Sequence, residues 1–138
     1  HGLRQGLFSA DFAKSYGEHK GFYRLPNPFI VDSSICGLLR DREVIGIWCY
    51  GREFAKANNL KGFFTSMFIS NEQEGRAFGY EGHSEQTYLQ QDEKLADMLN
   101  TLLKDNVPLS QWPNWLQTHC DRELDFVRFN YDNVAYFE

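Results

Sequence analysis

The chain has 138 residues and a formal net charge of −5. This length fits one domain, because two domains would each be too small to hold a good core. The acidic balance argues against nucleic acid as the main partner, since neutralising phosphates needs a basic surface. No apolar run reaches the roughly 18 residues of a membrane span, so we expect no membrane association.

Aromatic residues make up 16% of the chain, with 12 Phe, 7 Tyr and 3 Trp. Aromatic side chains bury large areas and contribute most to the energetics of cores and interfaces. A domain of this size does not bury all of them. We therefore expect the remainder to line a groove or a surface that faces a partner.

The cysteines Cys36, Cys49 and Cys120 are an odd set and follow no zinc-ligand spacing. Each lies beside apolar residues, where Cys acts as a small hydrophobe, so a reducing, cytoplasmic location is the simplest expectation. His119 and Cys120, with His83 and another cysteine, carry zinc-binding atoms, but without ligand spacing zinc binding is the weaker interpretation. We expect no metal and no cofactor.

Residues 1–20 are predicted to form a short helix or an irregular lead-in, because apolar side chains recur there at helical spacing. The prolines at positions 26 and 28 then exclude a helix interior. They direct the chain into an extended segment, Phe29-Ile30-Val31.

Residues 34–50 carry the pattern of a β-hairpin, with strands at 34–40 and 43–50 around a polar turn, Asp41-Arg42. In this register Gly37 lies opposite Gly46 on one face. The other face is uniformly apolar, which predicts core.

Two further hairpins are predicted, at 63–81 and 124–137. Three helices are predicted: one at 52–59, one within 84–105 and a short one that Ser110 caps. The resulting fold class is α+β, with an antiparallel sheet of about six or seven strands built from hairpins. One long amphipathic helix and two or three short ones pack on that sheet.

Two groups of residues are candidate ligand contacts. The glycine pair Gly37 and Gly46 leaves a flat floor beside Trp48 and Tyr50, where a ligand can approach the backbone closely. Alternatively, a helix packs on that floor, as most apolar stripes are core.

The second group, Tyr80, Glu81 and His83, lies between a predicted strand and a predicted helix. There His83 can act as a general base that Glu81 or Glu85 orients. The alternative is purely structural, with Ser84 as a helix cap and the acids favouring the helix N-terminus.

Trp112 and Trp115 share one face of the predicted short helix. Exposed tryptophans mark partner surfaces, whereas buried ones dock a helix on its own sheet. The two interpretations are about equally favoured.

Residues 74–79, Glu-Gly-Arg-Ala-Phe-Gly, resemble the Q/R-x-x-G-x-G/A signature of the acyl-CoA-dependent N-acetyltransferases. The resemblance implies a loop whose amides bind the CoA pyrophosphate, with Tyr80, Glu81 or His83 as proton-transfer candidates. Glu74 stands where that signature has Gln or Arg, and Ala77 replaces its central glycine. The competing interpretation of 74–79 is a polar hairpin loop.

The absence of a convincing catalytic set favours a non-enzymatic domain that binds a ligand or a protein partner, and we expect a homo-oligomer. An apolar or cationic aromatic compound suits an aromatic-lined groove that also holds a carboxylate. The alternative is a small N-acetyltransferase-like enzyme that uses the 74–79 loop.

Overall fold

The fold, described here from a computed structural model, covers residues 2–8 and 29–138. A first sheet, in the order β1-β2-β3, pairs its strands antiparallel; these are β1 (Gly2–Leu3), β2 (Gly6–Phe8) and β3 (Phe29–Asp32). A second sheet has the order β4-β5-β6; its strands are β4 (Glu43–Gly46), β5 (Lys61–Phe64) and β6 (Ala135–Phe137). The α-helices are α2 (Cys36–Leu39), α3 (Gly51–Asn58), α4 (Glu72–Ala77), α5 (Glu85–Lys104), α6 (Trp112–His119) and α7 (Asp125–Asp132). Short 3-10 helices, η2 (Ser33–Ile35) and η3 (Leu109–Gln111), precede α2 and α6.

The centre of the fold is a strand–helix–strand unit, in which α3 connects the parallel strands β4 and β5. Parallel strands need such a crossover, because a tight turn can join only antiparallel ones. Within β5, Gly62 has φ of +121° and a Cβ there would overlap the backbone N and O of Val44. Glycine therefore permits the close approach of the two strands.

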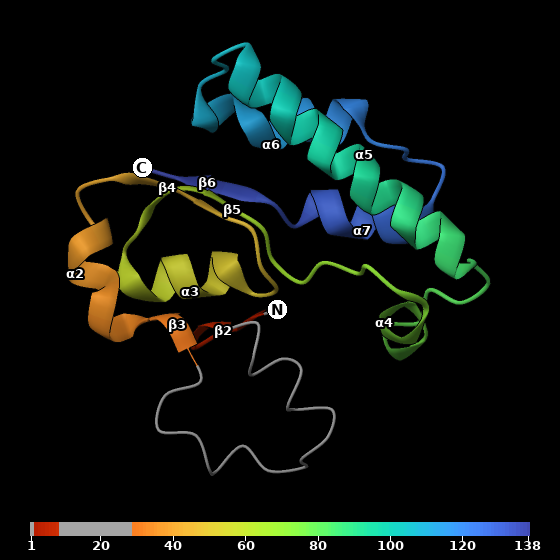
Figure 1. Ribbon diagram of the computed structural model, residues 1–138, viewed down its shortest axis with the longest axis horizontal. Helices are drawn as coiled ribbons and strands as arrows, with labels where there is room; N and C mark the ends of the chain where they lie inside the picture. Colours follow the sequence, from red (N-terminus) through yellow and green to blue (C-terminus); the bar gives the residue numbers. More distant parts are fainter. Residues whose placement is uncertain (1, 9–28) are drawn as a thin grey trace.

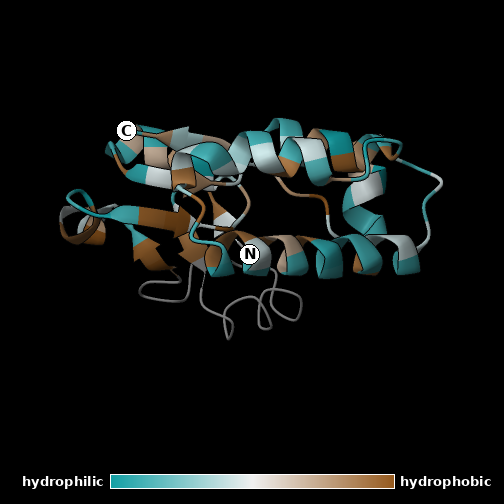
Figure 2. Ribbon diagram, turned by 90° about the horizontal axis from the view of Figure 1, so that it is seen from above, coloured by the Kyte–Doolittle hydropathy of each residue, from teal (hydrophilic) through white to brown (hydrophobic). Residues whose placement is uncertain are grey.

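Two consecutive aromatic residues of β5 supply the two hydrophobic cores, because successive strand residues point to opposite faces. Phe64 packs with Trp48 and Phe54 in the core under α3, whereas Phe63 packs against Trp112 in the core formed by the C-terminal helices. Figure 1 shows α3 on one side of this sheet and α5 and α6 on the other. In Figure 2 hydrophobic residues are concentrated in the strands, while hydrophilic residues run along much of the helices.

The hairpin predicted at 34–50 is wrong. Residues 36–39 form helix α2, and β4 pairs in parallel with β5 rather than antiparallel with a preceding strand. Alternation of apolar residues predicts a strand but does not identify the strand with which it pairs. Here β4 pairs with β5, which follows the crossover helix α3.

The other two hairpins are also wrong, since residues 72–77 form α4 and residues 125–132 form α7. In α7 the buried residues are Phe126, Val127, Asn130 and Tyr131. These buried residues are spaced to share one face of a helix. In a short apolar run, the same residues also show the alternation of a strand, so periodicity alone does not separate the two. The α+β class is confirmed, but the described residues form two three-stranded sheets instead of one sheet of six or seven strands.

Other predicted elements are confirmed. The extended segment at 29–31 is part of β3, the helix at 52–59 is α3, and the long helix is α5, capped by Ser84. The predicted lead-in at 1–20 is wrong for residues 2–8, which form β1 and β2. The rest of that lead-in, and the proline-containing stretch before β3, lie outside the described residues. Among the described helices, none has the length and hydrophobicity needed to cross a bilayer.

The side chain of Asn130 on α7 fixes the irregular segment that follows β5. Its Oδ1 accepts from the Ile69 N–H at 2.8 Å, and its Nδ2 donates to the Ile69 carbonyl at 2.9 Å. Asn130 is 2% exposed and Ile69 1%. Because buried backbone groups must find partners, one carboxamide replaces the ladder bonds that a strand would supply at this position.

We predict that Asn130→Ala lowers the free energy of unfolding by about 2–4 kcal/mol, since it leaves a buried donor and a buried acceptor unpaired. Asn133→Ala is the matched control. Its Nδ2 donates to the Phe129 carbonyl of the same helix at 2.7 Å, and its loss should cost about 1 kcal/mol or less. Urea unfolding of both variants measures the difference, and equal losses would contradict the role of Asn130.

Candidate functional site

A pocket of about 180 Å³ lies at the carboxyl ends of the two parallel strands. Ligands of open α/β sheets bind at this edge, where the chain leaves one strand and enters the following helix or loop. The residues that line the pocket follow β4, follow β5 or belong to α4; they are Ile47, Trp48, Cys49, Thr65, Phe68, Ser70 and Glu74.

Hydrogen bonds hold the two walls of the pocket together. The Thr65 N–H donates to the Gly46 carbonyl at 2.9 Å, and the Thr65 hydroxyl donates to the Trp48 carbonyl at 3.0 Å. The Cys49 thiol donates to the Phe68 carbonyl at 3.8 Å. The turn after β4 is thus tied to the segment after β5, so the walls are largely pre-formed.

The carboxylate of Glu74 is the charged group in this pocket. Its Oε2 accepts from the Ser70 N–H at 2.9 Å and from the Ser70 hydroxyl at 3.2 Å. Asn71 caps α4 by accepting from the Glu74 N–H at 2.9 Å. Over residues 2–8 and 29–138 no hydrogen-bond partner is found for Oε1, so that oxygen is available to a ligand.

The negative charge of Glu74 acts on its neighbours. Burial, assisted by the charges of Glu74 and Glu85, raises the pKa of Asp92 from 3.8 to about 6. Burial and the same Glu74 charge raise the pKa of the Cys49 thiol. A protonated thiol is a poor nucleophile, and the local field favours a cation.

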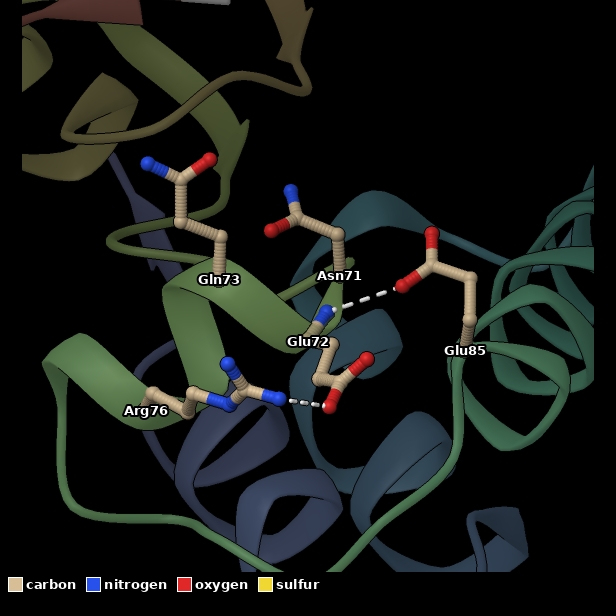
Figure 3. A pocket seen from close by; sticks show the side chains of 5 residues that line it. All are labelled: Asn71, Glu72, Gln73, Arg76 and Glu85. Atoms are coloured by element: carbon tan, nitrogen blue, oxygen red, sulfur yellow. Dashed lines mark hydrogen bonds and ion pairs between the residues drawn. The ribbon is translucent and has the colours of Figure 1, made fainter.

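A second, larger pocket of about 500 Å³ lies on another side of α4 and is lined only by polar residues. Figure 3 shows that its carboxylates are already engaged: the guanidinium of Arg76 pairs with Glu72, and Glu85 accepts from the Glu72 N–H at 3.0 Å. Ligand sites are mostly apolar with a few placed polar groups. The smaller pocket, backed by the buried Trp48, fits that description better.

The glycine floor expected on a hairpin does not exist. Gly37 lies on α2 with open space around it, and Gly46 pairs with Phe64 of β5 instead. A Cβ on Gly46 would overlap the rings of Phe64 and Trp48, so packing within the chain covers that face. Trp48 does line the pocket. Tyr50 instead begins the turn into α3 with φ of 64°, and its ring lies 5.5 Å from the Arg4 guanidinium.

His83 has a hydrogen-bond partner that we did not predict. The ring Nε2 of His83 lies 2.8 Å from Oδ1 of Asp125 on α7, not beside Glu81 or Glu85. Partial burial is the largest single effect and disfavours ionised Asp125. The hydrogen bond and charge of His83, together with backbone hydrogen bonds from Phe126 and Asp125, outweigh it, so the pKa of Asp125 is lowered. The His83 ring also packs on Phe126 at 5.0 Å between centroids.

The hydroxyl groups near His83 are occupied. The Tyr88 hydroxyl donates to the Tyr80 carbonyl at 3.1 Å, and the Ser84 hydroxyl is 3.0 Å from that of Thr87. Glu81 is exposed. His83 therefore anchors the loop before α5 to the start of α7, and this geometry favours the structural interpretation over general-base catalysis.

Of the two tryptophans predicted as an interface, Trp112 is 1% exposed and belongs to the core. Its Nε1 donates to the Val107 carbonyl at 2.8 Å. Trp115 is partly buried and stacks on His119, with ring centroids 3.9 Å apart. Docking of α6 on its own core therefore accounts for Trp112.

Residues 74–79 do not form the loop that the N-acetyltransferase resemblance implies. They span most of α4 and the turn after it. The amides of Glu74, Gly75 and Tyr80 donate to protein acceptors, so they are not directed at an anion. Within the described ranges there is likewise no group of three or more His, Cys, Asp or Glu residues arranged to hold a metal.

Sequence reasoning missed six of the seven pocket residues: Ile47, Cys49, Thr65, Phe68, Ser70 and Glu74. The signal in the sequence was the polar run Asn-Glu-Gln-Glu, which follows an apolar segment. This run is also typical of the capped start of a helix. Placing that helix at the carboxyl ends of β4 and β5 requires their parallel pairing, which the hairpin prediction excluded.

The chain matches no protein-family model, no curated protein and no solved structure.

We predict that Asp92→Asn stabilises the protein above pH 6. Because the pKa of Asp92 is higher in the folded chain than the ordinary 3.8, the folded state holds a proton that the unfolded state releases. Stability therefore falls as pH rises from about 4 to 6. Asparagine does not ionise and therefore removes this loss of stability. We expect the free energy of unfolding to rise by about 1 kcal/mol above pH 6, after allowance for solvent screening at a half-exposed group.

Urea unfolding at pH 4 and pH 7.5 measures the effect. Glu93→Gln, on the exposed side of the same helix, is the control for a general change in net charge. An equal response of the two variants would contradict the specific raising of the Asp92 pKa.

Proposed function

We propose that the chain is a non-enzymatic binding domain whose pocket takes a small ligand with one aromatic or apolar ring and a positively charged group. The observation that carries the proposal is the Glu74 carboxylate, held by two hydrogen bonds at the rim of a pocket that contains Trp48 and Phe68. A carboxylate with a free oxygen pairs with an ammonium or amidinium group.

The size of the pocket sets the size of the ligand. Its volume is about 180 Å³, and an apolar cavity of about 150 Å³ holds one benzene ring. A single ring or a branched alkyl group fits, whereas a nucleotide or a CoA does not. Aromatic walls add cation–π attraction for a ligand cation near their faces.

The chemistry of the pocket supports binding rather than catalysis. The Cys49 thiol has a raised pKa. The Thr65 hydroxyl donates to a backbone carbonyl, and the Ser70 hydroxyl donates to Glu74. Each of these potential nucleophiles is protonated or engaged. Among the residues that the structure describes, no histidine lines the pocket to serve as the usual activating base of covalent catalysis.

We predict that benzylamine, protonated at pH 7, binds the protein and that Glu74→Gln weakens this binding at least tenfold. Loss of one charge-assisted hydrogen bond, about 1.5 kcal/mol, corresponds to that factor. Glu72→Gln removes the same charge two residues away, on the side of α4 that faces the other pocket, and should leave the affinity unchanged.

Titration calorimetry of wild type and both variants measures the effect, with benzyl alcohol as the neutral analogue. Its binding should be weaker and indifferent to Glu74→Gln. Equal affinity of benzylamine for the wild-type protein and the Glu74→Gln variant would refute the role assigned to Glu74.

A further inference from the structure

Within the described part of the chain, the outer edge of β4 presents unpaired backbone groups. In the second sheet β4 is one of the two edge strands, and among residues 2–8 and 29–138 it pairs only with β5. The N and O of Val44 face β5, as their proximity to Gly62 requires, and the Gly46 carbonyl accepts from Thr65. Alternate residues of a strand direct their backbone to opposite edges. The N–H and C=O of Ile45 therefore face away from β5.

Apolar side chains accompany this edge and lead into the pocket. Ile45 is 41% exposed and Ile47 is 44% exposed. Ile47 follows β4 directly and also lines the pocket that contains Glu74. Edge strands of monomeric proteins usually carry charges, prolines or bulges that prevent pairing. β4 carries one such charge, the exposed Glu43 at its start, and the exposed isoleucines at positions 45 and 47 follow it.

We propose that an extended segment of a partner polypeptide adds to the free edge of β4 and inserts a lysine or arginine side chain into the pocket. Main-chain hydrogen bonds supply affinity in this recognition mode and side-chain pockets supply specificity. The inference rests on the proposed function, because it uses the same pocket and the same carboxylate.

The charge of the site selects a basic partner over a second copy of this chain. The Glu74 carboxylate lies at the pocket, and Glu74 and Glu85 are close enough to Asp92 for their charges to act on it. The chain has a net charge of −5, so a basic segment complements this edge, whereas a second copy brings further negative charge to it. A lysine stem can lie along Ile47 while its ammonium reaches Glu74, since long basic side chains bury their methylenes and extend their charge.

The test uses a blocked peptide, acetyl-Thr-Val-Thr-Val-Lys-Thr-amide, titrated against the full chain. We expect it to bind at least tenfold more tightly than benzylamine. Glu74→Gln, or replacement of the peptide lysine by norleucine, should weaken binding at least tenfold. Glu72→Gln should leave it unchanged.

Strand pairing has its own signature. Two peptide analogues carry N-methyl groups on alternate amides, one set in each analogue. Only the set that faces β4 should abolish binding, because the other set faces solvent. Ile45→Pro removes the N–H that faces away from β5 and leaves the hydrogen bonds between β4 and β5 in place. This variant should no longer bind the peptide but should still bind benzylamine.

The outcomes separate the two proposals. If benzylamine binds through Glu74 but both N-methylated peptides bind as well as the parent, strand addition is overturned and the ligand pocket stands. If neither benzylamine nor the peptide responds to Glu74→Gln, the proposed function fails as well. Self-association that Ile45→Pro abolishes, measured by analytical ultracentrifugation, would assign the edge to a second copy and overturn the partner peptide.

Discussion

The carboxamide of Asn130 is the interaction on which the arrangement of this protein depends. It pairs with both backbone groups of Ile69 in a segment that has no sheet or helix of its own. The C-terminal helix α7 is thereby joined to the chain that leaves β5. That chain carries Phe68 and Ser70, so the same contact positions one wall of the candidate pocket. Stability and the candidate pocket thus share one buried polar contact.

Many of the aromatic residues are used in building two cores. The side chains of Phe63 and Phe64 are both fully buried, one in each core. Trp48 serves the core under α3 and the pocket at once. The composition alone predicted a groove with aromatic walls, and the pocket has only two, Trp48 and Phe68. In the part of the chain that the structure describes, packing therefore uses many of the aromatic rings, and the proposed recognition depends on the few rings at the strand ends.

Local patterns predicted the elements that local interactions determine. Helices α3 and α5 follow from apolar spacing and caps, and Ser84 caps α5 by accepting from the Thr87 N–H at 3.3 Å. The errors fall where a partner distant in sequence decides. Residues 125–132 alternate like a strand, yet Asn130 must face Ile69. Trp48 was predicted as a ligand contact, but Glu74 was not, because only the parallel pairing of β4 with β5 brings α4 to the pocket.

The position of β6 has a consequence for the order of assembly. This strand pairs with β5, from which about half the chain separates it. Contacts between residues so distant in sequence slow folding, because a long loop must close before they form. On the ribosome, β4, α3 and β5 emerge well before β6. Until β6 arrives, the β6-facing edge of β5 and the isoleucine-bearing edge of β4 are both open. A nascent chain in that state has two unpaired strand edges at which chaperones can bind or misassembly can begin.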